Sequence, residues 1–261
     1  MLIICNGAFK SGSTWVHALV DVILDVRSVP MTDIPEQYNL SKSPVSKIAE
    51  SKLPDFVANE DILNKNYLTK AHFFQVDTLS RSYPDGVRFI FVQRDLRDAV
   101  VSHYHHLKVY RNFKYSFKTY YRFLGRYKAY EIWLFNQRCK KYFGDENMFT
   151  YADMKADTGA AIDHLCKIIE VAPLSDEERQ AVVDRTSLDS MRKQAASGDQ
   201  RFYHGAGDQN SKLFRKGKIG EYKEHFDASS LKDIDGIEAG RFSALGRMVY
   251  ALLFTVRRKL K

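Results

Sequence analysis

The chain has 261 residues, of which 44% are hydrophobic, and carries a formal net charge of +8 with a pI near 9.2. This length fits one large α/β domain or two small ones, and the charge indicates an anionic partner: a nucleotide, a nucleic acid, a sulfated or phosphorylated substrate, or a membrane surface. The sequence argues against a membrane-spanning protein, because no segment approaches the ~20 apolar residues that a bilayer requires. It also argues against a secreted protein, because the apolar stretch 1–7 has no basic region before it and is too short for a signal peptide. The three cysteines, Cys5, Cys139 and Cys166, are far apart, which favours reduced thiols in a cytoplasmic protein over disulfides or a zinc site.

The first predicted elements are a strand over residues 2–7, a small polar loop and a helix over 16–24. A strand, a tight loop and a helix together form a common phosphate site, because the loop N–H groups and the helix N-terminus point at one spot. Gly7 and Gly12 have nearly the spacing of a Walker A loop, but Ser13 stands where its lysine belongs and the lysine is Lys10. We therefore expect an anion site that differs from an ATP–magnesium site. The alternative is an ordinary turn with a solvated lysine.

Residues 28–66 contain several prolines and are expected to be irregular, with one short helix near 45–50. Apolar runs predict further strands over 67–71, 87–93 and 148–151. The other expected helices are 77–82 (or a turn), one from 96 onward, an aromatic one over 117–142, 158–170, 175–184 and a tail from 233. Ser175 and Glu178 form a predicted capping box. Residues 196–220 are expected to form a long loop that is either ordered or lid-like.

Strands that alternate with helices predict an α/β fold with a parallel sheet, in which ligands bind beyond the carboxyl ends of the strands. Four of the predicted strands end in polar residues that are useful for chemistry: Lys10, His72, Arg94 and Tyr151. We therefore expect these side chains to converge at one edge of the sheet.

His72 follows a strand and lies two residues after Lys70, so it is a candidate to accept a proton from an attacking hydroxyl, since the pKa of histidine lies near neutrality. A structural histidine is the alternative. Trp15 is placed either to stack on a base or to pack in the core.

Arg94 and Ser102 are eight residues apart, and a helix between them allows both to contact one anion. An ion pair between Arg94 and Asp98 is the alternative. Residues 215–220 combine cations with glycines, which suits a loop whose backbone wraps a phosphate. The alternative is a flexible basic loop or a nucleic-acid-binding patch.

The stretch 108–128 is rich in basic and aromatic residues and contains no acidic one. Such a stretch suits single-stranded nucleic acid or a substrate channel, but we favour a helix that buries one aromatic face and exposes its charges. The amphipathic basic tail over 245–261 resembles a membrane-surface helix, but we expect it to pack as the last helix, without membrane contact.

Together these stretches resemble the cytosolic-type sulfotransferases, which use 3′-phosphoadenosine 5′-phosphosulfate (PAPS). The stretches that carry the resemblance are residues 10–15, 70–72, 94–106, 151–155, 186–191 and 215–223. The resemblance implies a P-loop-like three-layer fold with a central parallel sheet flanked by helices. It also implies a single sulfotransferase domain over 1–261, with a basic helical tail over about 233–261.

The resemblance implies PAPS as cofactor and a role for each matching residue. The 5′-phosphosulfate would be held by Lys10, Ser11, Gly12, Ser13 and Thr14. The adenosine would be enclosed by Trp15, Tyr151, Thr186, Leu188 and Met191, with Phe214 against the base. The 3′-phosphate would be bound by Arg94, Ser102, Arg215, Lys216 and Gly217. His72 would be the general base, and Lys10 and Lys70 would stabilise the transferring sulfuryl group.

The sequence departs from the family pattern in several places. Phe9 replaces the usual proline before the loop lysine. In the last matching stretch, Glu221 and Tyr222 replace the family's aspartate and tryptophan. The dimer signature that would begin at Lys223 is altered, so the oligomeric state is left open.

The expected activity is in-line transfer of a sulfuryl group, without a metal, to an alcohol, phenol or amine of a small molecule such as a natural product. One alternative is a P-loop kinase that acts on a small molecule, which would need a lysine after Gly12. The other is a basic nucleic-acid-binding protein, which does not explain the order of the motifs, so no nucleic-acid partner is expected.

Overall fold

The computed structural model describes residues 1–40, 47–197, 214–215 and 217–242. The chain divides into two compact units, the first made of Met1–Arg94 with Arg138–Gly217 and the second of Asp95–Gln137 with the residues from Lys218 onward. The expectation of a single domain over 1–261 stays a prediction.

The first unit contains a four-stranded parallel sheet with the strand order β2-β1-β3-β4. The strands are β1(Leu2–Gly7), β2(Tyr67–Ala71), β3(Val87–Gln93) and β4(Met148–Thr150). The predicted strands are therefore confirmed, except that Tyr151 begins the following helix. Because the strands are parallel, the residues that follow them lie at one edge of the sheet.

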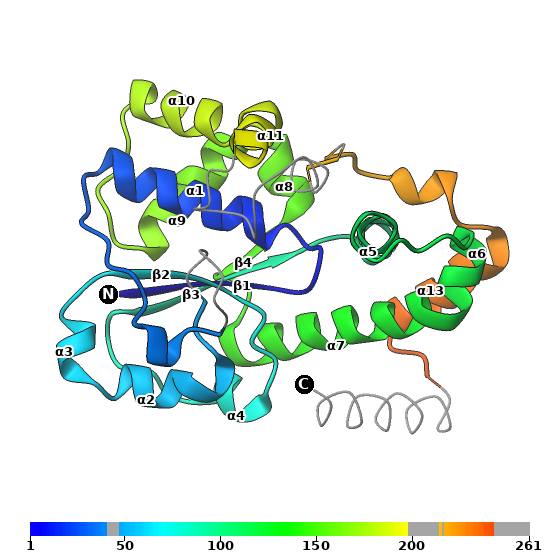
Figure 1. The fold of residues 1–261 in the computed structure, drawn as a ribbon, viewed down its shortest axis with the longest axis horizontal. Coiled ribbons are helices and arrows are strands. Elements are labelled where there is room, and N and C mark those ends of the chain that lie inside the picture. The colour runs from blue at the N-terminus through cyan, green and yellow to red at the C-terminus, as the bar shows by residue number, and fades with distance from the viewer. Residues whose placement is uncertain (41–46, 198–213, 216, 243–261) are drawn as a thin grey trace. The chain divides into compact units, whose positions relative to one another are not determined.

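Helices cover both faces of this sheet. Figure 1 shows α1 and α8 to α11 on one face and α2 to α4 on the other. Their bounds are α1(Ser13–Val26), α2(Leu53–Val57), α3(Glu60–Leu63), α4(Val76–Leu79), α8(Tyr151–Ala156), α9(Thr158–Ile168), α10(Asp176–Arg185) and α11(Leu188–Ser197), with the 3-10 turns η1(Glu36–Tyr38) and η2(Glu50–Lys52). This is the expected α/β fold, a central parallel sheet flanked by helices.

The core on the α1 face is aliphatic, and the core on the opposite face is aromatic. Leu19 and Ile23 of α1 are fully buried against Ile90 of β3 and Leu165 of α9. On the other face the rings of Phe89, Phe91 and Phe143 contact one another, as do those of Phe56 and Tyr67. Each such side chain contributes about 1.5–3 kcal/mol on burial, so the sheet is a rigid support for its carboxyl edge.

The predicted helix near 45–50 is wrong for the described part of that range. Ile48 forms an isolated antiparallel bridge with Asn39, and helices begin only at Glu50. Pro54 stands in the first turn of α2, where its missing N–H costs nothing, and Asn59 caps α3 by accepting from Ile62 N. Helix α11 was not expected, and most of the predicted loop over 196–220 lies outside the described residues.

The second unit is helical in its described part. Its elements are α5(Leu96–Tyr110), α6(Phe117–Tyr120), the π-helical turn η3(Tyr121–Gly125), the start of α7(Arg126–Phe143), the 3-10 turn η4(Glu221–Glu224) and α13(Ala228–Glu238). The predicted helix from 96 is confirmed and is capped by Asp95. The tail helix begins at Ala228, capped by Asp227, and not at Asp233; residues 243–261 lie outside the described part.

The basic aromatic stretch 108–128 buries part of its rings and exposes most of its charges, while Tyr115 and Phe123 are 66% and 70% exposed. Phe117, Tyr120 and Tyr121 are buried, and Phe117 and Tyr121 contact the ring of Phe226. Lys118 is 85% exposed. The stretch is not one helix, because α5 ends at Tyr110 and α6 begins at Phe117. The interpretation of a helix with one buried aromatic face therefore holds only from Phe117 onward, where η3 interrupts the α-helix. None of the described helices is long and apolar enough to cross a membrane.

Candidate functional site

The loop between β1 and α1 is folded so tightly that two of its positions require glycine. A Cβ at Gly7 would lie 2.8 Å from Ser11 Oγ and 2.9 Å from Val92 Cγ1. Gly12 has a φ of 109°, and a Cβ there would lie 2.8 Å from the ring of Tyr151. Lys10 adopts a φ of 70°, and Ser11 donates from both its N and its Oγ to the carbonyl of Ala8, at 3.1 and 2.7 Å. This compact loop leads directly into the N-terminus of α1, the geometry that binds anions.

Cations surround this loop. Burial, followed by the nearby charges of Arg94 and Arg215, lowers the pKa of Lys10 to about 8. A lysine beside two arginines is electrostatically strained until an anion is bound. Because the first turn of α1 contains no acidic residue, the helix N-terminus adds a further positive potential.

Lys70 lies on β2, beside the start of α1. Its ammonium group donates to Thr14 Oγ1 at 2.5 Å. Burial, followed by the charges of Lys47 and Lys10, lowers the pKa of Lys70 to about 7. Lys70 is therefore close to half-charged at neutral pH, and a nearby anion would favour its charged form.

The imidazole of His72 is oriented by the backbone of the loop. His72 Nδ1 lies 2.6 Å from the carbonyl oxygen of Gly7. A carbonyl only accepts, so Nδ1 carries the hydrogen and Nε2 of the neutral ring is left as the basic nitrogen. The Asn6 side chain fixes the next residue, because Phe73 N donates to Asn6 Oδ1 at 2.8 Å and Asn6 Nδ2 donates to the Phe73 carbonyl at 3.2 Å.

Aromatic and apolar side chains flank the cations. The guanidinium of Arg94 lies 4.6 Å from the centre of the Tyr151 ring, and the ring of Trp15 meets Tyr151 edge-on at 5.5 Å. Trp15 and Phe214 are partly buried against the cluster of Ala18, Met191 and Ala195. Such flat apolar surfaces suit a purine base.

Two cations bind the backbone carbonyls of Phe214, Arg215 and Gly217. Arg192 Nε donates to the Phe214 carbonyl at 2.6 Å, and the same guanidinium donates to the Arg215 carbonyl. The Lys155 ammonium group donates to the Gly217 carbonyl. Gly217 has a φ of 58°, and a Cβ there would lie 3.3 Å from Tyr151 Oη and 3.6 Å from Leu188 Cδ2.

Most of the sequence-predicted residues therefore come together in the first unit, at the carboxyl edge of the sheet and on α11. Thr186 is buried at the end of α10, and its hydroxyl donates to the Val182 carbonyl at 2.7 Å. Ser102 lies on α5 of the second unit, and Lys216 lies outside the described residues.

The sequence analysis assigned no role in this site to Asn6 or Arg192, and it placed Lys155 in the matching stretch 151–155 without giving it a role. Asn6 could have been recognised as a candidate, because it is an amide in an otherwise apolar strand. Arg192 gave no local signal, because its partners are backbone carbonyls that lie 22 and 23 residues away.

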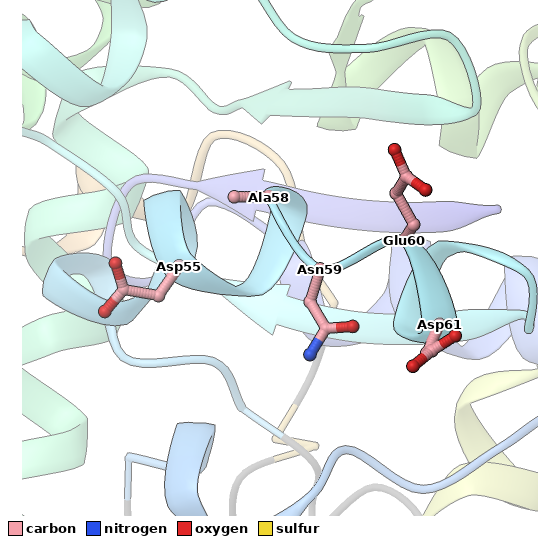
Figure 2. A pocket seen from close by; sticks show the side chains of 5 residues that line it. All are labelled: Asp55, Ala58, Asn59, Glu60 and Asp61. Atoms are coloured by element: carbon pink, nitrogen blue, oxygen red, sulfur yellow. The ribbon is translucent and has the colours of Figure 1, made fainter.

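A separate surface depression is lined by Asp55, Ala58, Asn59, Glu60 and Asp61 of the α2–α3 region (Figure 2). Helix α3 lies on the side of the sheet where β1 begins (Figure 1). Its carboxylates would repel an anionic ligand, so this depression is a different surface from the cation-lined loop.

Residues 2–246 match the family model described as "Sulfotransferase domain". The chain belongs to the sulfotransferase family. It is thus an enzyme of the sulfotransferase class, as the cation-rich loop and the motifs beyond the strands indicated.

Individual relatives of this sulfotransferase are distant but cover most of it. Cytosolic sulfotransferase 1 of Danio rerio is 22% identical over 243 residues, which are 87% of this chain and 78% of that protein. The crystal structure of mouse sulfotransferase SULT7A1 complexed with PAP has a TM-score of 0.66 at 18% identity and covers 95% of this chain and 86% of its own. The crystal structure of retinol dehydratase in complex with androsterone and the inactive cofactor PAP has a TM-score of 0.62 at 16% identity. It covers 93% of this chain and 81% of its own. At these identities the structures show that the fold is shared.

Proposed function

We propose that this sulfotransferase transfers a sulfuryl group from PAPS to a hydroxyl or amine of a small molecule, with His72 as the general base. The observation that supports this most is the grouping of Lys10, Arg94 and Arg215 at a tight loop whose Gly7 carbonyl orients His72. A cationic site next to an oriented imidazole suits transfer from an anionic donor to a proton-bearing nucleophile.

The nucleotide would be bound at three places. The 5′-phosphosulfate would meet the loop amides, the N-terminus of α1 and the side chains of residues 10–14. The adenosine would lie among the rings and apolar side chains of Trp15, Tyr151, Thr186, Leu188, Met191 and Phe214. The 3′-phosphate would be held by Arg94, Ser102, Arg215, Lys216 and Gly217. The PAP in the SULT7A1 complex supports a nucleotide of this kind.

His72 would act through its Nε2. This nitrogen takes the proton of the acceptor hydroxyl as the acceptor oxygen bonds to sulfur and the bond between sulfur and the 5′-phosphate oxygen breaks. Lys10 and Lys70 stabilise the charge that develops on the transferring group and on the departing phosphate. These cations supply the countercharge, so no metal is included in the proposal.

The acceptor would have an apolar body. The Phe9 ring lies 6.0 Å from the His72 ring, and the buried Phe73 follows His72 directly. We propose an alcohol, phenol or amine of a small natural product, and a cytoplasmic location. The buried thiols of Cys5, Cys139 and Cys166 support that location.

The test is sulfuryl transfer itself. We expect the purified protein with PAPS to add the mass of one sulfuryl group to at least one member of a panel of phenols, alcohols and amines. His72→Ala is expected to lower the turnover by about 10²–10⁴, the usual contribution of a general base. Its affinity for PAP, measured by calorimetry, should stay within about twofold of wild type, because the substitution does not touch the cations.

His164→Ala is the matched control, since His164 is a half-buried histidine on α9 that packs on Phe149. It should keep both transfer and PAP binding. Normal turnover in His72→Ala would reject the base, and failure of the wild type to bind PAP would reject the donor.

A further inference from the structure

The second unit contains a cluster of two histidines and one carboxylate that the proposed reaction does not use. His105 lies on α5, Glu221 begins η4, and His225 directly follows η4. One ligand atom from each residue lies within 4.8 Å of those of the other two. We propose that these three side chains bind one divalent transition-metal ion of the zinc type.

Two hydrogen bonds to Asp98 bring the two segments together. Asp98 lies on α5, two helical turns before His105, so both face the same side of the helix. Its carboxylate accepts from Gly220 N at 2.7 Å and from Tyr222 N at 3.1 Å. These bonds hold the backbone on both sides of Glu221 against α5, which places the Glu221 carboxylate beside His105.

The surroundings favour a bound cation. Glu221 is only 2% exposed, and buried charged groups in proteins are typically paired with an opposite charge or coordinate a metal. The rings of His105 and His225 lie 5.3 Å apart at 74°, and Tyr104 and Phe117 contact them from the sides. Aromatic surroundings of this kind reduce the access of water to the cluster.

The donor set fits zinc better than calcium or magnesium. Two imidazoles and one carboxylate are a common ligand set for zinc, whereas the hard cations prefer oxygen ligands alone. Metal–ligand bonds of about 2.0–2.2 Å require the ligand atoms to approach more closely than 4.8 Å. The two half-buried imidazoles can make that approach by side-chain rotation, and a water molecule would complete a tetrahedral site.

The experiment uses the full chain without a polyhistidine tag, freed of metal with a chelator and dialysed. Zn²⁺ is titrated in competition with a chromogenic chelator, and Co²⁺ is followed by its visible absorption. We expect saturation at one equivalent for both ions. His105→Ala and His225→Ala should each weaken the affinity at least tenfold, as the loss of one of three ligands requires.

The matched control is His106→Ala, because His106 is the neighbouring residue on α5 and stacks on Tyr110. It should bind zinc as the wild type does. Glu221→Gln, which keeps the size of the side chain, provides a second test if the alanine variants fail to fold, and it should also weaken binding at least tenfold.

Absence of saturable binding in the wild type would overturn the proposal. Full affinity in folded His105→Ala or Glu221→Gln protein would overturn it as well, and so would a loss in His106→Ala equal to that in His105→Ala.

Discussion

Lys10 and Lys70 are held in the first unit at a cost in electrostatic free energy. Both groups are half-buried beside other cations, and the pKa of each is far below the ordinary value for lysine, about 8 for Lys10 and about 7 for Lys70. Their unfolded pKa is higher, so the unfolded chain binds more protons than the folded chain between pH 7 and 10. The stability of the ligand-free protein should therefore rise with pH over that range from this source.

The same pKa shifts predict that nucleotide binding takes up protons. At pH 8 the free protein has Lys70 mostly neutral and Lys10 about half neutral. A phosphate beside them favours the charged forms, so binding should take up about one proton and affinity should fall as the pH rises from 7 to 9. Calorimetry of PAP binding at pH 8, in buffers with different ionisation enthalpies, measures this uptake. An enthalpy independent of the buffer would contradict it.

Asn6 acts on the site through Phe73. Its side chain makes two hydrogen bonds to the backbone of Phe73, the residue after His72. The orientation of the imidazole thus depends on an amide in the neighbouring strand as well as on the carbonyl of Gly7.

Asn6→Ala should lower kcat by about tenfold or more, because small displacements of a reacting group cost up to roughly 10² in rate. Stability should fall by about 1–3 kcal/mol, the usual cost of buried backbone groups left without partners. PAP affinity should change little. Asn66→Ala is the control, since the Asn66 amide also donates to a backbone carbonyl, that of Pro30. Equal kcat losses in the two variants would refute the positioning role of Asn6.

Among elements, α11 matters most for Phe214 and Arg215. Arg192 projects from this helix to the carbonyls of Phe214 and Arg215, while Met191 of the same helix packs against the ring of Phe214. The helix therefore holds both the backbone and a side chain of a segment that we propose to bind the 3′-phosphate and the base.

Arg192→Ala should weaken PAP binding by about tenfold, because a charge-assisted hydrogen bond contributes about 1.5–3 kcal/mol and part of that is recovered from water. Turnover at saturating PAPS should change less than affinity. Lys193→Ala removes a charge from the exposed side of the same helix and should leave binding unchanged. Calorimetry on the two variants distinguishes a positioning effect from a general loss of positive charge.

The regular elements could be predicted because their causes are local. The apolar run of β3 and the capping box of α10 can be recognised from neighbouring residues, and both are found. The π-helical turn η3 was not predicted, because such turns are rare and occur as single-turn bulges inside α-helices. The reason for glycine at position 125 is visible only in the structure, where a Cβ would lie 2.8 Å from the Tyr120 ring.

The site was predictable to the extent that it follows from strand ends. Lys10, Lys70 and Arg94 follow or end parallel strands, so their place at one edge is a consequence of the topology. The links made by Asn6 and Arg192 join segments that are distant in sequence, and no local pattern reports a side chain that binds a remote carbonyl.

For the whole molecule, the net charge of +8 attracts any polyanion, so selectivity has to come from the geometry of the cations. A ligand that binds only the folded protein raises its stability by about 2.7 kcal/mol at 100 times the dissociation constant. For a chain of this size that corresponds to an increase in Tm of roughly 5–10 °C.

We expect PAP to raise the Tm by this amount and Mg–ATP to raise it by less than about a quarter as much. The reason is that Ser13 stands after Gly12, where a magnesium-nucleotide loop has lysine. Thermal unfolding with matched ligand concentrations measures the difference. Equal shifts would favour the kinase alternative, and a shift with single-stranded RNA that disappears steeply with salt would favour nucleic-acid binding.

The ring of Tyr151 makes the two ends of this site interdependent. The ring lies so close to Gly12 that a Cβ there would approach it to 2.8 Å, and the guanidinium of Arg94 packs over the same ring. A larger residue at position 12 would push the ring and shift the arginine with it. Any evolutionary or engineered change of donor nucleotide would therefore have to alter loop and arginine in concert, through paired substitutions and not through a single one.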